Sequence, residues 1–409
     1  MKKVLTALSL ILLLLVVGII LLPVIYKNKI KDYALQTINS KVDATISYDR
    51  FSLTLFQSFP DFTATFKGLA IVGKDVFAND TLVSIKEISA QIDLSSLLKD
   101  DGILIKEIYT DGSKINMLRT KEGKSNWKIS KPAASENIPT TNAEKTAAVS
   151  EPSKFLLRDI KMNDLSFIFD NRRSDFTYSI LNANLNLSGE LKGMETVLDL
   201  DINSPSMNFT MDGSNFIKEA PFSLKTSLLA YLDSIKFIFD SQKSEINSMP
   251  LNIEGSFAYP RDSMIFDMKF DIPEIGLNTL FKMIPEDYKK TVEKAEAKGR
   301  INFNGIIKGV YYKEITPLIN IAFNIENGTV KYPGLPDELK INEASAYVFK
   351  PEGNFDNLEI GVKKLNINMA GNPIAMHAKV KSVIKDPNID AALKGVLDLG
   401  NLLKLFPVE

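Results

Sequence analysis

The sequence predicts a mainly β protein in which an N-terminal transmembrane helix precedes a long, curled antiparallel β-sheet of groove-like form, with few short helices. From about Tyr48 onward, apolar and polar residues alternate with a period of two, which is typical of strands with one apolar face. Residues 4–22 form an almost unbroken run of Ile, Leu and Val, and helical periodicity is sparse elsewhere. These observations define the fold class and its order along the chain.

The stretch from Val4 to Leu22 predicts a membrane anchor. Apart from one Thr, one Ser and one Gly it is apolar, and at about 1.5 Å per residue it spans roughly 28 Å, close to a hydrocarbon core of about 30 Å. The competing interpretation is a cleaved signal peptide, which has a shorter apolar region followed by small residues. Pro23 and further apolar residues follow instead. Lysines flank the run on both sides, so the positive-inside rule leaves the orientation open.

Four regions follow from these patterns. The helix is expected to continue to about Ser40. Residues 130–153 lack periodicity and are rich in Pro, Ala, Ser and Thr, so they cannot bury enough apolar area to offset their ordering entropy. The predicted regions are an anchor with a helical extension (1–40), a first β region (41–129), a disordered linker (130–153) and an elongated β-groove region (154–409). The sequence at 280–285 is echoed at 402–407, which predicts that the last region is truncated within a repeating unit.

Within the β regions, the alternation is clear enough to assign faces. Leu198, Leu200 and Ile202 alternate with aspartates, and similar runs recur at 181–187, 266–272 and 319–326. The alternation changes phase between Val362 and Leu365, which predicts a β-bulge. Helices are expected only at 277–298, interrupted at Pro285, and at 402–406.

The apolar face of so long a sheet must be covered. At one strand per 8 to 12 residues, the β regions would hold about 25 to 35 strands, and open sheets rarely exceed about ten strands without curling or splitting. One solution is a set of two or three β-sandwiches. The other is a single sheet curled into a trough whose apolar inner face receives a hydrophobic ligand. Periodicity does not distinguish the two, because both need the same alternation.

The residues that carry catalysis or bind metals are scarce. The chain has no Cys and one His, His377, in a strand pattern on the polar phase, so a surface residue is expected there. Asp199 and Asp201 begin like a calcium loop that then lacks its Gly and Glu. A phosphate-loop match ending at Ser125 lacks its first Gly. Adjacent acids at 100–101 and 286–287 are expected in solvated turns. We therefore expect no enzyme activity, no cofactor and no metal site.

The charge balance also argues against nucleic-acid binding. Forty-nine Lys and Arg residues face 50 Asp and Glu residues, so the basic surplus that phosphate backbones require is missing. The candidate site is instead the apolar phase of the strands, whose competing role is an ordinary core. The predicted lining residues are Phe167, Phe169, Leu185, Leu187, Phe209, Phe237, Phe239, Phe266, Phe270, Phe323 and Ile325.

A resemblance to a known family rests on a series of short motifs. They lie at 92–98, 102–108 and 115–119, followed by Gly123 and Asn126-Trp127, with Phe59-Pro60-Asp61-Phe62 upstream and the segments 327–333 and 373–399 downstream. Together they resemble the AsmA family over nearly the whole chain. Considered alone, Trp127 is expected to pack on the edge of the first β region.

The resemblance implies a function that needs no catalytic residue. AsmA-like proteins are anchored in the inner membrane by one span, carry their β body in the periplasm and are related to bridge-like lipid-transfer proteins. The expected function is therefore binding or conduction of phospholipid between the inner and outer membranes. The alternative is a structural or assembly factor for outer-membrane proteins, with outer-membrane or periplasmic assembly proteins as partners. An envelope hydrolase dependent on His377 is a third, weaker interpretation.

Overall fold

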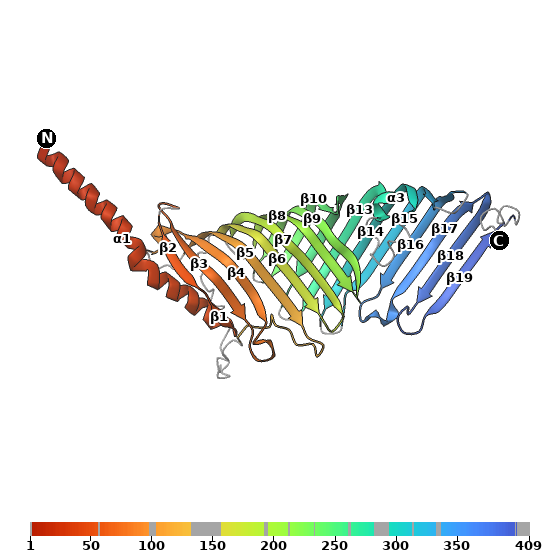
Figure 1. Ribbon diagram of the computed structural model, residues 1–409, viewed down its shortest axis with the longest axis horizontal. Helices are drawn as coiled ribbons and strands as arrows, with labels where there is room; N and C mark the ends of the chain where they lie inside the picture. Colours follow the sequence, from red (N-terminus) through yellow and green to blue (C-terminus); the bar gives the residue numbers. More distant parts are fainter. Residues whose placement is uncertain are drawn as a thin grey trace, which may run out of the picture. The chain divides into compact units, whose positions relative to one another are not determined.

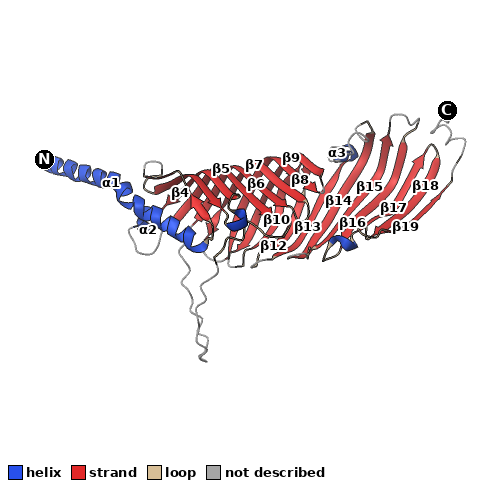
Figure 2. Ribbon diagram, turned by 60° about the horizontal axis from the view of Figure 1, so that its bottom comes forward, coloured by secondary structure: helices blue, strands red, loops and turns tan. Residues whose placement is uncertain are grey.

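The computed structural model describes residues 2–55, 58–97, 104–131, 157–191, 195–211, 213–232, 234–260, 263–281, 294–312, 315–332, 337–396 and 398. The side chains of residues 2–21 are outside this description. The described chain is mainly β, as predicted (Figures 1 and 2). Its contacts divide it into two compact units, Met1–Gly193 and Met194–Glu409.

Unit 1 contains one long helix and seven strands among its described residues. Its helices are α1 (Lys2–Lys41), η1 (Asp75–Phe77) and α2 (Leu94–Leu97). Its strands are β1 (Thr45–Ser47), β2 (Arg50–Thr54), β3 (Phe62–Val72), β4 (Thr81–Ile92), β5 (Ile105–Arg119), β6 (Leu157–Asn171) and β7 (Phe176–Leu191). Strands β1 and β2 both pair with β3, and the order then runs β3, β4, β5, β6, β7.

One pair in unit 1 corrects the expectation of a wholly antiparallel sheet. Strands β5 and β6 run parallel, with Glu107 opposite Asp159 and Arg119 opposite Asn171. Parallel neighbours need a connection of about a dozen or more residues that returns the chain to its starting end. Residues 120–131 begin that return, because Ser130 forms a bridge with Val42 beside the end of α1. Residues 132–153 of the predicted linker lie outside the described residues.

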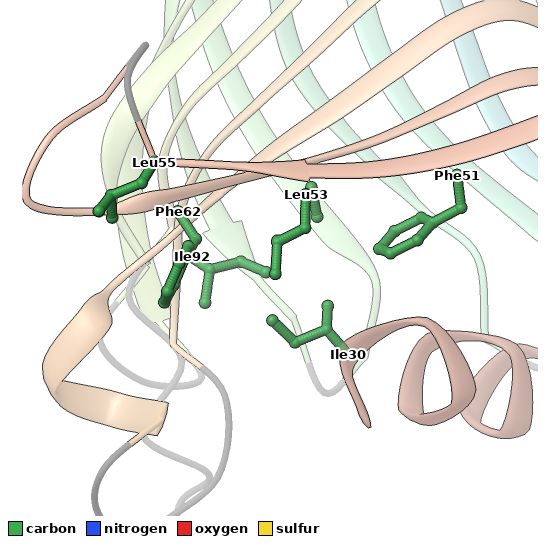
Figure 3. Close-up of a cluster of buried hydrophobic side chains, with 7 residues drawn as sticks. Ile30, Phe51, Leu53, Leu55, Phe62 and Ile92 are labelled. Atoms are coloured by element: carbon green, nitrogen blue, oxygen red, sulfur yellow. The ribbon is translucent and has the colours of Figure 1, made fainter. Parts of the chain in front are cut away.

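The second half of α1 packs on the apolar face of β2, β3 and β4. Leu22, Tyr26 and Ile30 recur every four residues and therefore share one helix face. Ile30 is 3% exposed and meets Phe51 and Leu53 in the main buried cluster of unit 1 (Figure 3). The helix ends within one residue of the predicted end, because Val42 already forms a bridge with Ser130 and β1 begins at Thr45.

The predicted anchor lies at the other end of α1. Val4 and the rest of the run up to residue 21 belong to α1 by their backbone, while their side chains lie outside the described set. Among the residues whose side chains the structure describes, no helix combines the length and apolarity needed to cross a membrane.

Unit 2 contains twelve strands among its described residues. They are β8 (Glu195–Met211), β9 (Ser214–Tyr231), β10 (Lys236–Ile246), β11 (Met249–Pro250), β12 (Asn252–Ala258), β13 (Met264–Gly276), β14 (Glu296–Tyr311), β15 (Leu318–Lys331), β16 (Leu339–Lys350), β17 (Glu359–Met369), β18 (Asn372–Lys381) and β19 (Asn388–Gly395). Two short helices, α3 (Leu277–Phe281) and η2 (Phe355–Asn357), complete the unit.

The unit 2 strands form a single antiparallel sheet, in which each strand pairs with its neighbours in sequence, apart from the short β11 beside β10. Strands β13 to β19 lie side by side in one layer (Figures 1 and 2). Within each unit, the described strands therefore form a single sheet and not a set of β-sandwiches. The strands among the described residues of both units are also fewer and longer than predicted, because β8 and β9 reach 17 and 18 residues.

Two local predictions for unit 2 have opposite outcomes. The predicted bulge is confirmed, since the register between β17 and β18 shifts between Val362 and Leu365. The helix predicted at 277–298 is wrong at its end, because Glu296 already begins β14 and pairs with Lys331. Only α3 is helical among the described residues of that stretch, and the helix expected at 402–406 lies outside them.

Candidate functional site

One face of the unit 2 sheet is a continuous apolar surface. Residues paired across neighbouring strands point to the same side of a sheet, so the register defines rows that cross it. One row contains Ile253, Phe270, Gly305, Ile321, Val348, Ile360, Val380 and Ile389, each paired with the next. Aliphatic and aromatic side chains thus follow one another on seven of these eight strands, and the ring of Phe270 covers Gly305 on the eighth.

The opposite face is polar and carries cross-strand ion pairs. In unit 2, Lys269 lies 3.0 Å from Glu254 and Lys308 lies 3.1 Å from Asp267. In unit 1, Lys67 lies 2.9 Å from Glu87 on the equivalent polar side. Such exposed pairs contribute little stability each, but they identify this face as the one that water covers.

In unit 1, the predicted lining residues lie on one face of β6 and β7. Leu187 pairs with Ile160 and Leu185 with Met162. Phe167 pairs with Ile180, and Phe169 with Tyr178. Phe169 also has its ring centroid 5.5 Å from that of Phe176.

A row of irregular residues keeps these apolar side chains on one side. Gly112, Asp164 and Asn182 have positive φ at neighbouring points of β5, β6 and β7, and the Asn182 amide donates to the Asp164 carboxylate at 2.8 Å. Each change of phase within a strand is thus matched by one in the next. Bulges bend strands and increase twist, so this row is a physical cause of curl in unit 1.

In unit 2, the register brings six of the seven predicted residues onto the apolar face. Phe237 and Phe266 both pair with Phe257, Phe270 covers Gly305, and Phe323 packs edge-on against Phe303 at 5.1 Å. Phe239 lies two residues from Phe237, and Ile325 lies two residues from Phe323. The seventh, Phe209, lies beyond two register shifts, pairs with Ile217 and contacts Phe216.

None of the eleven predicted lining residues is buried. All are partly exposed, whereas Ile30, Phe62 and the other core residues beneath α1 are almost fully enclosed. In unit 2, α3 covers part of the face, where Leu277 and Ile301 are buried. Phe257 and Phe303 are further lining residues that were not predicted, although the same alternation in β12 and β14 would have identified them.

The residues considered for catalysis or metal binding are dispersed. His377 is exposed in β18 opposite Ala392, as predicted. Asp199 and Asp201 are strand residues of β8 whose carboxylates contact Ser227 and Lys225. The part of the chain that the structure describes brings no three His, Asp or Glu side chains together in a metal-binding arrangement. The acids at 100–101 and 286–287 lie outside that part.

A family model described as the AsmA family matches residues 1–251. The chain belongs to the AsmA family. No curated protein and no solved structure matches it.

The structure explains the Gly-x-x-Asn-Trp motif of this AsmA-family chain. The Asn126 side chain is buried, accepts a hydrogen bond from the Leu118 amide at 2.9 Å and donates one to the Asn116 carbonyl at 2.9 Å. Trp127 then packs on Phe169, with ring centroids 5.5 Å apart. The tryptophan therefore lies against β6, beside the last strand of the first β region, because the segment after β5 turns back along the sheet.

A second AsmA-like motif, Phe59-Pro60-Asp61-Phe62, anchors an ion cluster. Asp61 receives hydrogen bonds from Lys106 and from Gln91, and Lys106 also contacts Asp93 at 2.6 Å. Burial alone would raise the pKa of Asp93, but hydrogen bonds from Lys106 and Ser95 outweigh it and hold that pKa at about 2. The cluster joins the chain before β3 to β4 and β5, so its role is to hold the sheet together.

Lys350 is a charged residue on the apolar face of this AsmA-family sheet. It pairs with Ile319 and is 1% exposed, and its ammonium donates to the carbonyls of Thr316 and Pro317 at 3.0 and 2.6 Å. Burial lowers the pKa of Lys350 to about 8. The ammonium therefore points toward the backbone of residues 316–317 and away from the exposed part of the apolar face.

Proposed function

We propose that this AsmA-family protein binds phospholipid through the apolar face of its β-sheet and conducts it between the inner and outer membranes. One observation carries the proposal: the predicted lining side chains that lie on the apolar face of each unit, all except Phe209, stay partly exposed, and the opposite face of each sheet bears ion pairs. A face of this kind is an aggregation hazard unless it has an occupant.

The energetics favour an acyl chain as that occupant. Two chains with about 30 methylenes would cost roughly 24 kcal/mol to expose to water, at about 0.8 kcal/mol per buried CH₂. A row of apolar side chains that crosses eight strands removes that cost at each step along its length. Movement along such a surface needs no catalytic residue, so the function that we propose is not enzymatic.

The proposed location is the inner membrane, with α1 as a single-pass anchor and the β body in the periplasm. The apolar run at residues 4–22 supports the anchor, and the AsmA membership supports the location and orientation. Pro23 and the lysines that follow it mark the place where the helix would leave the membrane.

Photo-crosslinking tests lipid binding directly. A benzophenone amino acid at Phe323, on the apolar face of β15, should crosslink to phospholipid in membranes of the producing cell. The same residue at Asn320, which is exposed on the opposite face of β15, is the matched control and should give no lipid adduct. Mass spectrometry of the adducts identifies the lipid.

Two outcomes would contradict the proposal. Equal lipid adducts at both positions would mean that the label reports the nearby membrane and no specific face. Protein adducts at Phe323 without lipid would favour the alternative, in which the face contacts outer-membrane proteins during assembly.

A further inference from the structure

The last described strand of unit 2 has a free edge. All eight residues of β19 are exposed, and the strand pairs with β18 along one side only among the described residues. The Val396 amide donates to the Pro373 carbonyl at 3.2 Å. Because hydrogen-bonded pairs alternate in antiparallel sheets, the backbone groups of Ile389, Ala391, Leu393 and Gly395 point to the free edge.

Apart from the charges of Asp390 and Lys394, β19 carries none of the features that commonly protect a sheet edge. Edge strands are commonly blunted by prolines, bulges, short length or inward charges, whereas β19 is in unbroken register with β18 and its edge-facing residues are apolar or Gly. Ile389 is 69% exposed and Leu393 is 66% exposed. The edge is thus open for pairing with another strand.

The sequence of β19 is complementary to itself. We infer that β19 pairs antiparallel with β19 of a second copy of this chain, about a two-fold axis at Ala392. This register places Asp390 opposite Lys394 twice, Ala391 opposite Leu393 twice, and Ile389 opposite Gly395 twice. Opposite charges that face each other across strands stabilise a pair, and like charges destabilise it.

The other symmetric registers are worse. A two-fold axis at Asp390 places Asp390 of one copy opposite Asp390 of the other, and an axis at Lys394 does the same for Lys394, so like charges face each other. An axis at Ala391 or at Leu393 leaves Asp390 opposite an uncharged residue. In the Ala392 register each Asp390 lies between Lys379 of its own β18 and Lys394 of the second copy. The apolar residues of both copies then share one face, so the apolar surface continues from copy to copy.

The absence of cysteine allows a position-specific test in the full-length protein. Ala392 would face its own copy in a pair that is not hydrogen-bonded, with Cα atoms about 4.5 Å apart, which is within the range that disulfides span. Ala392→Cys should therefore give a disulfide-linked dimer on mild oxidation. Ala391→Cys is the matched control, because its two copies would lie about 8 Å apart. Absence of the Ala392→Cys dimer, or equal yields from both variants, would overturn the inference.

A charge exchange tests the register independently. Asp390→Lys and Lys394→Asp should each weaken self-association about tenfold or more, because each creates two like-charge pairs per dimer. A mixture of the two variants should restore a dimer, since every cross-strand pair is then opposite in charge. Sedimentation would show a mass near twice 45.6 kDa for the wild type and for the mixture. A monomeric wild type, or a mixture no more associated than either variant alone, would overturn the inference.

Discussion

Phe323 shows most directly whether the apolar face is open. Its ring packs on Phe303 and remains partly exposed. On an open face, an arginine at this position keeps its charge in contact with water, whereas in a sealed core it would bury an unpaired charge.

We therefore expect Phe323→Arg to lower the melting temperature by only a few degrees while it blocks lipid binding. Asn320→Arg, on the polar face of the same strand, should change neither property. Thermal melts together with lipid analysis of the purified proteins make the comparison. Loss of folding in Phe323→Arg alone would mean that the face is closed by other parts of the protein.

Lys350 should make stability depend on pH in the alkaline range. Burial lowers its pKa from 10.5 to about 8 in the folded protein, so between these values the unfolded chain binds a proton that the folded chain lacks. Stability then rises with pH. Relative to Lys350→Met, the wild type should gain up to about 3 kcal/mol in the free energy of unfolding between pH 7.5 and 10.5. Urea unfolding at several pH values measures this difference. A constant difference would contradict a lowered pKa.

At the residue level, alternation predicted which side chains share a face but left their exposure open. The period of two places Phe266 and Phe270 together whether the face is sealed or open. Phe209 shows the limit of this pattern, because it lies beyond two register shifts, one in β8 and one in β9, and the shift in β9 leaves no trace in the sequence of β8.

Among the elements, the segment after β5 has the clearest role. It turns at Gly123, is held by the Asn126 amide and covers Phe169 with Trp127, the only tryptophan in the chain. Its position lets the chain return to the starting end of β5 before β6 begins.

Asn126→Ala should therefore release this segment. The change leaves the Leu118 amide and the Asn116 carbonyl without their partner, at a cost of about 1–3 kcal/mol. We expect a lower melting temperature and a red shift of the Trp127 fluorescence as the ring loosens from Phe169. Asn320→Ala, at an exposed site, serves as the control. An unchanged emission spectrum would show that Trp127 is held by other contacts.

An element was predicted correctly where the pattern that defines it lies within one stretch of sequence. The end of α1 and the bulge in β17 follow from local patterns. The parallel pairing of β5 and β6 did not follow, because alternation is the same for both strand directions. The helix predicted through residue 298 failed because Glu296, Ala297 and Lys298 are good helix formers whose pairing with β15 overrides their propensity.

At the scale of the whole molecule, each unit has one sheet with an apolar and a polar face. Such a protein should be stabilised by ligands that cover the apolar side, because a ligand that binds only the native state adds about 2.7 kcal/mol at a hundred times its Kd.

A short-chain phospholipid should accordingly raise the melting temperature of the full-length protein in amphipol by several degrees. Phosphocholine, which has the headgroup without the acyl chains, should leave it unchanged. Differential scanning calorimetry measures both shifts. An equal shift from phosphocholine would show that the headgroup is what the protein recognises.

The parallel pair of β5 and β6 also affects how the chain is made. As it leaves the ribosome, each of β3, β4 and β5 can join a strand that has already emerged. Strand β6 can join only after the whole connection behind β5 has been synthesised, and distant contacts of this kind form slowly. Nascent chains therefore expose the unpaired edge of β5 during that interval. A chaperone that binds extended segments would find its target there.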